Sequence, residues 1–166
     1  MRTLGIDPGT AIMGWGVVDE AVGTLTMVDF GAFTTPAGMP QSERLLSLYR
    51  ELCALLERYH PEAAAIEELF FGKNVNTALT VGQARGVAML ALAQAGVPIY
   101  EYKPTVVKQA VAGYGGADKK QMQEMVRLTL RLVRIPKPDD AADALAIAIC
   151  HAYSAAMLQR IADSSR

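Results

Sequence analysis

The first ten residues constrain the fold more than any other stretch of the chain. An apolar run that includes Leu4 and Ile6 leads into Asp7, and a Pro-Gly pair then breaks it. This pattern predicts a strand over residues 2–7 with Asp7 at its carboxyl end. In α/β proteins, ligands bind in the crevice beyond the carboxyl ends of the strands. We therefore expect Asp7 to face a binding crevice.

Hydrophobic periodicity and turn residues predict regular structure along the whole chain. Strands are expected over residues 2–7, 14–20, 24–34, 63–67 and 97–102. Helices are expected from about Ser42, a candidate cap, to His60, then over 77–95, 104–112 and 119–133, and from a cap at Asp139 or Asp140 to about Arg160. Three strands followed by alternating helices and strands indicate an α/β fold, a mixed five-stranded sheet with helices on both faces. We expect residues 1–166 to form a single domain.

Composition places the chain among proteins with a sizeable core, because 51% of its residues are hydrophobic and 20% are charged. The longest apolar run, 141–157, is interrupted by Asp143 and His151, so no membrane span is predicted. Cys53 and Cys150 both lie in apolar helical patterns and are expected to be buried free thiols. With no signal peptide at the start, these features favour the cytoplasm.

Charge is unevenly distributed, although the net charge is only −1. Residues 70–137 carry ten basic and three acidic side chains, whereas residues 1–69 carry four basic and ten acidic ones. The basic segment could form a surface that attracts nucleic acid. Ordinary solvated helix faces would give the same counts.

Further carboxylates lie at the ends of other predicted elements. Glu67 ends the apolar strand 63–67 and Glu68 follows it, and because side chains alternate, at most one of them faces the crevice. Asp140 and Asp143 are three residues apart and share a helix face. Each has an ordinary explanation, as a turn residue, a strand end or a helix cap. Because these element ends can meet in one crevice with Asp7, we interpret the carboxylates as ligands for metal ions.

Carboxylate oxygens suit hard cations such as Mg²⁺, and two such ions about 3.5–4 Å apart can promote phosphodiester hydrolysis. Two cysteines and two histidines, all far apart in sequence, provide no zinc pattern and no nucleophilic triad.

Other residues suggest contacts with nucleic acid. Lys108 and Lys119 flank a glycine-rich turn and could reach phosphates, or simply be solvated. Phe70 and Phe71 follow Glu67 in a predicted loop. One ring could be core and the other stack on or wedge between bases, with Phe70 the better candidate for the wedge. The small residues of helix 77–95 would allow close packing on the sheet or a subunit interface.

These residues resemble those of the bacterial RuvC-type Holliday-junction resolvases over essentially the full chain. The matching stretches are Gly5-Ile6-Asp7-Pro8-Gly9, Ala65-Ile66-Glu67, Lys73-Asn74, Gly82-Gln83-Ala84-Arg85-Gly86-Val87, Val107-Lys108-Gln109 and Asp140-Ala141-Ala142-Asp143-Ala144-Leu145-Ala146. Each stretch alone is weak evidence for the family, but the order and spacing of all the stretches together are specific to it.

The resemblance implies a ribonuclease H-like fold, a homodimer, and Mg²⁺-dependent nicking of two opposed strands of four-way junction DNA, with Mn²⁺ able to substitute. It implies that Asp7, Glu67, Asp140 and Asp143 are the catalytic metal ligands, which favours Glu67 over Glu68 and Asp140 over Asp139. It also implies DNA contacts for Phe70, Lys108 and Lys119, a role in recombination and repair, and partnership with the RuvA-RuvB branch-migration complex.

The sequence also allows three other interpretations of its function. Sugar kinases and actin-like ATPases share a Gly-Ile-Asp-x-Gly-Thr opening, but they need a longer chain with a second phosphate loop. A junction-binding scaffold without chemistry would be expected to lack a carboxylate. A related anti-recombination or RNA-processing nuclease is harder to exclude, and the Asp-Ala-Ala-Asp pair and Phe70 favour the resolvase.

Overall fold

The computed structural model describes residues 1–68 and 75–164, and within them it contains five strands and five helices. The strands are β1 (Arg2–Asp7), β2 (Ile12–Ala21), β3 (Thr24–Thr34), β4 (Ala63–Glu67) and β5 (Ile99–Tyr102). The helices are α1 (Gln41–Tyr59), α2 (Val75–Gln94), α3 (Pro104–Ala112), α4 (Lys119–Thr129) and α5 (Asp139–Ser164). The predicted order of elements is confirmed.

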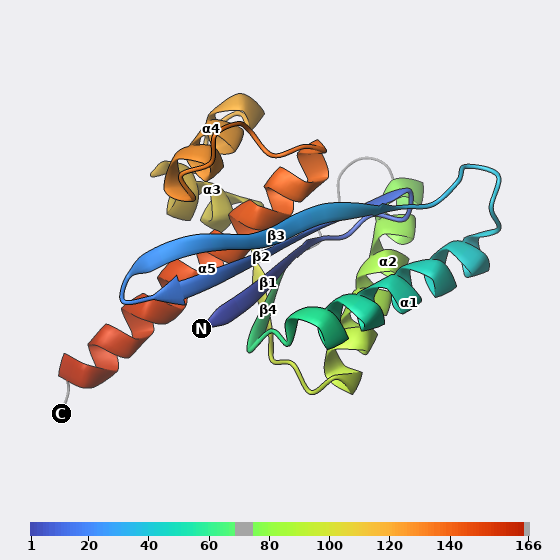
Figure 1. Cartoon of the computed structure of the whole chain (residues 1–166). Helices are drawn as coiled ribbons and strands as arrows, with labels where there is room; N and C mark the ends of the chain where they lie inside the picture. Colours follow the sequence, from blue (N-terminus) through green and yellow to red (C-terminus); the bar gives the residue numbers. More distant parts are fainter. Residues whose placement is uncertain (69–74, 165–166) are drawn as a thin grey trace.

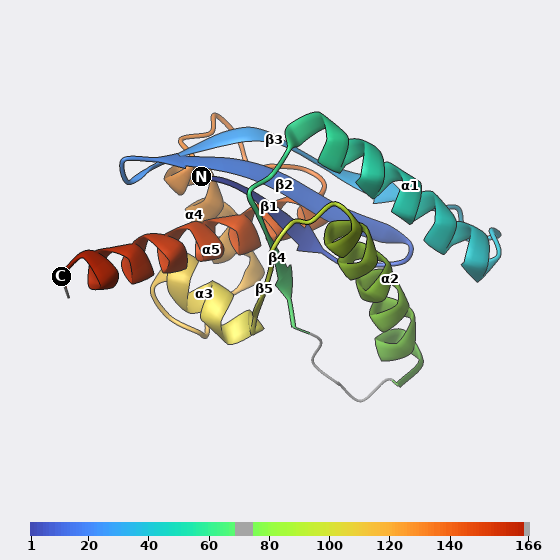
Figure 2. The same ribbon diagram turned by 90° about the horizontal axis from the view of Figure 1, so that it is seen from below.

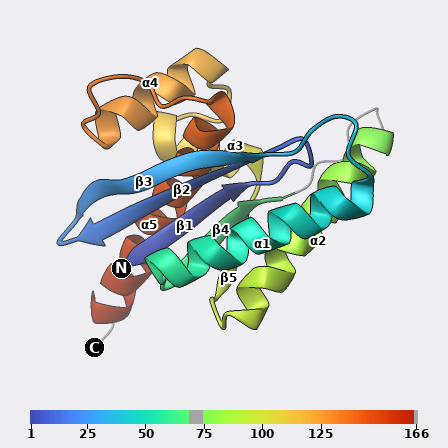
Figure 3. The ribbon, with the colours of Figure 1, turned by 45° about the vertical axis from the view of Figure 1, so that its right-hand side comes forward.

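The strands form one mixed sheet in the order β3-β2-β1-β4-β5 (Figure 3). Strands β1, β2 and β3 pair in antiparallel fashion, whereas β4 pairs in parallel with both β1 and β5. This follows from the connections, because short turns join the first three strands and helices join the rest. The carboxyl ends of β1, β4 and β5 therefore lie at the same edge.

Helices cover both faces of the sheet, as the sequence predicted (Figures 1 and 2). On one face, α1 and α2 pack on large side chains such as Leu4, Ile6 and Met13. On the other face, α5 lies along the sheet and α3 and α4 pack against α5. Within the described residues, no helix is both long and apolar enough to cross a membrane.

Several predicted boundaries are wrong for identifiable reasons. Helix α1 begins one residue before Ser42, which is not its cap, because the amides of Glu43 and Arg44 donate to the Pro40 carbonyl. Helix α4 ends at Thr129 rather than Val133, since Arg131 adopts a φ of 54° that breaks the helix.

Helix α5 begins at Asp139, so both Asp139 and Asp140 lie in its first turn and neither is the cap. The amide of Ala141 donates to the Pro138 carbonyl at 3.1 Å. The strand expected over 14–20 extends over Ile12–Ala21, and the strand expected from Val97 begins at Ile99. Cys150 is a buried free thiol, and Cys53 is a free thiol that is only partly buried.

Hydrogen bonds hold the turn after β1 against neighbouring elements. The Thr10 hydroxyl donates to the Thr80 carbonyl of α2 at 2.8 Å, and the Thr35 hydroxyl donates to the Thr10 carbonyl at 2.7 Å. The Thr35 amide donates to the Ala11 carbonyl at 3.0 Å. The segment that follows Asp7 is therefore fixed both to α2 and to the chain leaving β3.

Candidate active site

Asp7 and Glu67 are neighbours at the carboxyl edge of the sheet. Strands β1 and β4 pair in parallel with Ile6 opposite Ile66, so the next residue on each strand lies beside the other. The residues two positions earlier, Gly5 and Ala65, both pack toward α5. Since side chains alternate along a strand, both carboxylates point to the face that α5 covers.

Glycines in β1 and β2 let the first turns of α5 approach the sheet. A Cβ on Gly14 would lie 2.0 Å from the carbonyl oxygen of Asp140, and a Cβ on Gly5 would lie 2.0 Å from that of Ala144. Neither strand position therefore has room for any side chain. Because Gly14 pairs with Asp7 across the two strands, this close contact brings the start of α5 next to Asp7.

A cavity of 300 Å³ joins these elements. It is lined by Asp7, Glu67, Asp143, Lys108, Lys119 and five less polar residues. Asp140 does not line it, but its charge still acts on the carboxyl groups of Asp7 and Asp143. Five of the predicted site residues thus share one cavity, and Asp140 and Glu68 are not among the residues that line it.

Burial and mutual repulsion dominate the electrostatics of the carboxylates. Burial, followed by the charges of Asp143, Glu67 and Asp140, raises the pKa of Asp7 to about 7. Burial and the Asp143 charge also raise the pKa of Glu67, against the opposing effect of Lys108. The site therefore concentrates more negative charge than its own lysines neutralise, and an added cation would relieve this repulsion.

Two lysines and a further aspartate form an ion-pair network beside the cavity. Lys119 Nζ lies 3.2 Å from Asp139 Oδ2 and 3.6 Å from Asp143 Oδ2, and Lys137 Nζ lies 2.6 Å from Asp139 Oδ1. Hydrogen bonds from Lys137 and Lys119 lower the pKa of Asp139 to about 2. Partial burial lowers the pKa of Lys119, but the attraction of Asp143 and Asp139 outweighs it and the pKa is raised.

The donor atoms fit a hard divalent cation, because the cavity offers three carboxylates and its described lining residues include no cysteine or histidine. Within the described residues, no three acidic, histidine or cysteine side chains already form a single metal-ion coordination shell. Lys119 already pairs with Asp143, with Nζ 3.6 Å from Oδ2. Asp7, Glu67, Asp140 and Asp143 are the residues that would hold the ion.

The structure describes two of the three residues that were predicted to contact DNA. Lys108 and Lys119 both line the cavity, whereas Phe70 lies outside the described residues. Within the basic segment, Arg85 pairs with Glu101 and Arg127 pairs with Glu124. These pairs neutralise part of the excess positive charge of this segment.

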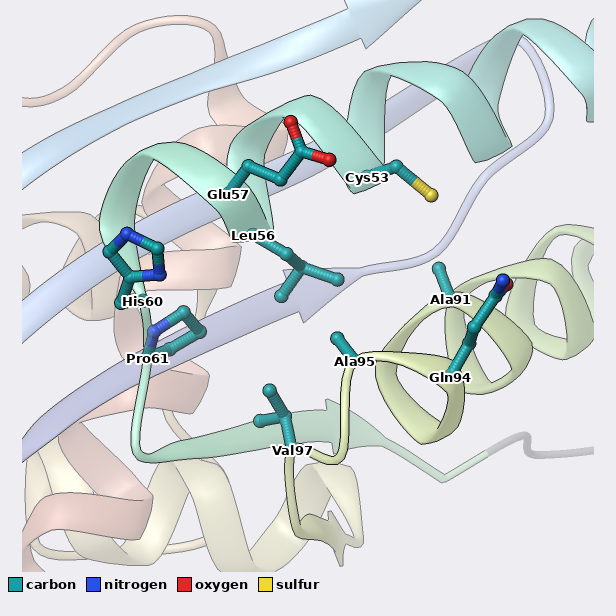
Figure 4. A pocket seen from close by; sticks show the side chains of 9 residues that line it. All are labelled: Cys53, Leu56, Glu57, His60, Pro61, Ala91, Gln94, Ala95 and Val97. Carbon is teal, nitrogen blue, oxygen red and sulfur yellow. The ribbon is translucent and has the colours of Figure 1, made fainter.

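A larger cavity of 470 Å³ lies elsewhere, between the carboxyl-terminal ends of α1 and α2 (Figure 4). Leu56, Ala91 and Val97 contribute apolar walls, and among the nine described residues that line it Glu57 is the one acid. It has no cluster of carboxylates with lysines. The cavity of 300 Å³ is therefore the better candidate site for hydrolysis of a phosphodiester.

Comparison with known proteins identifies the family. The profile of the family described as "Crossover junction endodeoxyribonuclease RuvC" matches residues 3–151. The chain belongs to the RuvC family. A Chloroflexus aggregans protein named crossover junction endodeoxyribonuclease RuvC is 78% identical over 160 residues, covering 96% of this chain and 98% of that protein.

Solved structures agree with the RuvC assignment. Thermus thermophilus RuvC in complex with a Holliday junction substrate matches with a TM-score of 0.87 and 38% identity, covering 95% of this chain and 96% of that one. The yeast mitochondrial Holliday junction resolvase Ydc2 matches with a TM-score of 0.65 at 14% identity, covering 95% and 82% of the two chains, and this likeness shows the fold alone. The fold is therefore the ribonuclease H-like fold of the RuvC resolvases.

Sequence reasoning missed two features of this RuvC site. The sequence pattern places Gly14 at the start of a predicted strand, although a glycine inside an apolar strand is itself a signal that another backbone approaches closely. The family resemblance favours Asp140 over Asp139, and nothing in the sequence indicates that Asp139 pairs with Lys119 and Lys137.

Proposed function

We propose that this RuvC-family protein is a Mg²⁺-dependent endonuclease that nicks two opposed strands of a four-way DNA junction during recombination and repair. One observation carries the chemistry: Asp7, Glu67 and Asp143 share a cavity with Lys108 and Lys119 at the carboxyl edge of the sheet. Carboxylates for a divalent cation and lysines for phosphate are what phosphodiester hydrolysis requires.

Each group has a role in this proposal. A bound Mg²⁺ ion, for which Mn²⁺ could substitute, would supply Lewis acidity for hydrolysis of the phosphodiester. Asp7, Glu67, Asp140 and Asp143 hold the cation in its place. Lys108 and Lys119 attract the scissile phosphate and offset charge that develops on it. Phe70, by the family resemblance, contacts the junction near its centre.

A homodimer is proposed because two symmetric nicks require two sites. Helix α2 supports it, since Leu79 and Leu90 are 63% and 60% exposed. A Cβ on Gly86, on the same side of the helix between them, would meet nothing within 4 Å. An apolar face interrupted by glycine suits close packing against a second helix. Cooperation with the RuvA-RuvB complex is carried over from the family as part of the proposal.

The test uses a labelled synthetic four-way junction and a linear duplex of the same sequence, each incubated with the protein and Mg²⁺. Paired symmetric nicks in the junction alone are expected. Asp7→Asn should abolish them while leaving junction binding largely intact, because binding depends mainly on phosphate contacts and shape.

Other outcomes would contradict distinct parts of the proposal. Junction binding without nicks would indicate a scaffold, and equal cleavage of both substrates would reject the junction preference. Normal nicking by Asp7→Asn would reject the metal-site assignment. Undiminished nicking in EDTA would reject the requirement for Mg²⁺.

A further inference from the structure

Lys119 occupies an unfavourable place for a cation. It is the first residue of α4, directly after the Asp118 cap, and Lys120 follows it. The amino end of a helix carries partial positive charge, so an ammonium group there is repelled unless anions lie nearby. The Asp118 carboxylate accepts from the Gln121 amide at 2.9 Å, and carboxylates from outside α4 stabilise the Lys119 ammonium at the cavity.

Two aspartates of α5 supply those carboxylates, and only one of them lines the cavity. Lys119 Nζ lies 3.2 Å from Asp139 Oδ2 and 3.6 Å from Asp143 Oδ2. Asp143 lines the cavity, whereas Asp139 is absent from the described lining residues. The second oxygen of Asp139 is 2.6 Å from Lys137 Nζ. Lys119 is thus shared between a proposed metal ligand and a carboxylate beside it.

We propose that Asp139 is a positioning residue that draws the Lys119 ammonium away from Asp143, so that Asp143 stays available to a divalent cation while Lys119 stays at the cavity. This inference rests on the proposed metal-dependent function. Without Asp139, Lys119 would pair with Asp143 alone. An incoming cation would then have to displace the ammonium from its only anionic partner in the network.

A simpler electrostatic role makes a different prediction. If Asp139 only added negative charge near the metal ligands, its loss would weaken metal binding whether or not Lys119 is present. If Asp139 acts by holding Lys119, its loss has no effect once Lys119 has been replaced. A double-mutant cycle on Asp139 and Lys119 separates the two roles.

The experiment measures Mn²⁺ binding to the DNA-free protein by the loss of the free-ion electron paramagnetic resonance signal. Asp139→Asn, which keeps the shape of the side chain, should raise the Mn²⁺ dissociation constant by roughly two- to fivefold, the size expected for an exposed ion pair. In the Lys119→Ala background the same substitution should leave the constant unchanged. A thermal melt by circular dichroism checks that each variant is folded.

Lys137→Ala is the matched control, because it removes the other partner of Asp139 and keeps the pair with Lys119. Its dissociation constant should match that of the unaltered protein. An equal rise in both Lys119 backgrounds, no rise in either, or an equal rise in Lys137→Ala would overturn the positioning role. Failure of the unaltered protein to bind Mn²⁺ would instead overturn the proposed metal-dependent function.

Discussion

The two faces of the sheet are covered in different ways. Toward α1 and α2, the strands present large buried side chains such as Leu4, Met13 and Val17. Toward α5, they present Gly5, Gly14 and other small residues, and the helix backbone lies directly on the strands. Both faces bury a hydrophobic core, and on the second face the glycines also fix a helix at a set distance from the strands. The difference teaches that the geometry of the site depends on the glycine-bearing face, whereas the opposite face contributes packing alone.

The sharpest test of this comparison uses adjacent residues that alternate between the faces. Glu67→Gln, on the α5 face, should reduce junction nicking by at least about a hundredfold, because it removes a proposed metal ligand. Glu68→Gln should change nicking by less than about twofold, since side chains alternate along the strand. Single-turnover cleavage of a labelled junction measures both, and equal losses would contradict the assignment of the two faces.

A methyl group added between α5 and the sheet should have the next largest effect. Gly14→Ala would force the carbonyl of Asp140 away from β2 and move the first turn of α5. Displacing reacting groups by about 1 Å can cost about a hundredfold in rate, so we expect a loss of that size. Gly38→Ala, where a Cβ would meet nothing within 4 Å, is the control and should nick normally.

On the opposite face, truncation should affect stability far more than catalysis. Leu52 is fully buried in α1, and Leu52→Ala should lower the free energy of unfolding by about 2–5 kcal/mol. Below the melting transition, its nicking rate should stay within about twofold of normal. Leu46→Ala, on the same helix but 47% exposed, should change neither quantity much. A large catalytic defect in folded Leu52→Ala would contradict the division between faces.

The smallest expected effect is a pH dependence of stability on the α5 face. Burial first, and then neighbouring carboxylates, raise the pKa of Asp7 from 3.8 to about 7. The folded protein then keeps a proton that the unfolded chain has released, so stability falls as the pH rises toward 7. In EDTA, urea unfolding should show a free energy lower at pH 8 than at pH 5 by roughly 2–4 kcal/mol.

Asp7→Asn is the control for this pH dependence, because an amide does not titrate. It should remove most of the difference between pH 5 and pH 8. A stability that rose with pH in the unaltered protein would contradict the buried, repelled state of Asp7.

Much of the fold was predictable because its signals are local. The bounds of β1, β3, β4 and α3 follow from apolar runs that end at turn residues or proline, and the structure has the same bounds. The end of α4 was not predictable in this way. Apolar residues continue to Val133, but the left-handed conformation of Arg131 ends the helix earlier.

The candidate site was predictable to a similar extent. The positions of Asp7 and Glu67 at strand ends, and of Asp143 near the start of a helix, predicted that these residues meet. In the structure all three line one cavity. The choice of Glu67 over Glu68 needed the family resemblance, and in the structure it follows from the pairing of β4 with β1. The sharing of Lys119 between two aspartates depends on how α4 packs against α5, which is a long-range contact that leaves no pattern in the sequence.

The hydrogen bond from Thr10 to the Thr80 carbonyl has a consequence for the proposed dimer. It ties the turn that follows Asp7 to α2, the helix whose exposed face is proposed to meet the second subunit. The packing of the paired α2 helices would then set the distance between the two active sites. In such a dimer the protein, and not the DNA sequence, would set the offset between the two nicks.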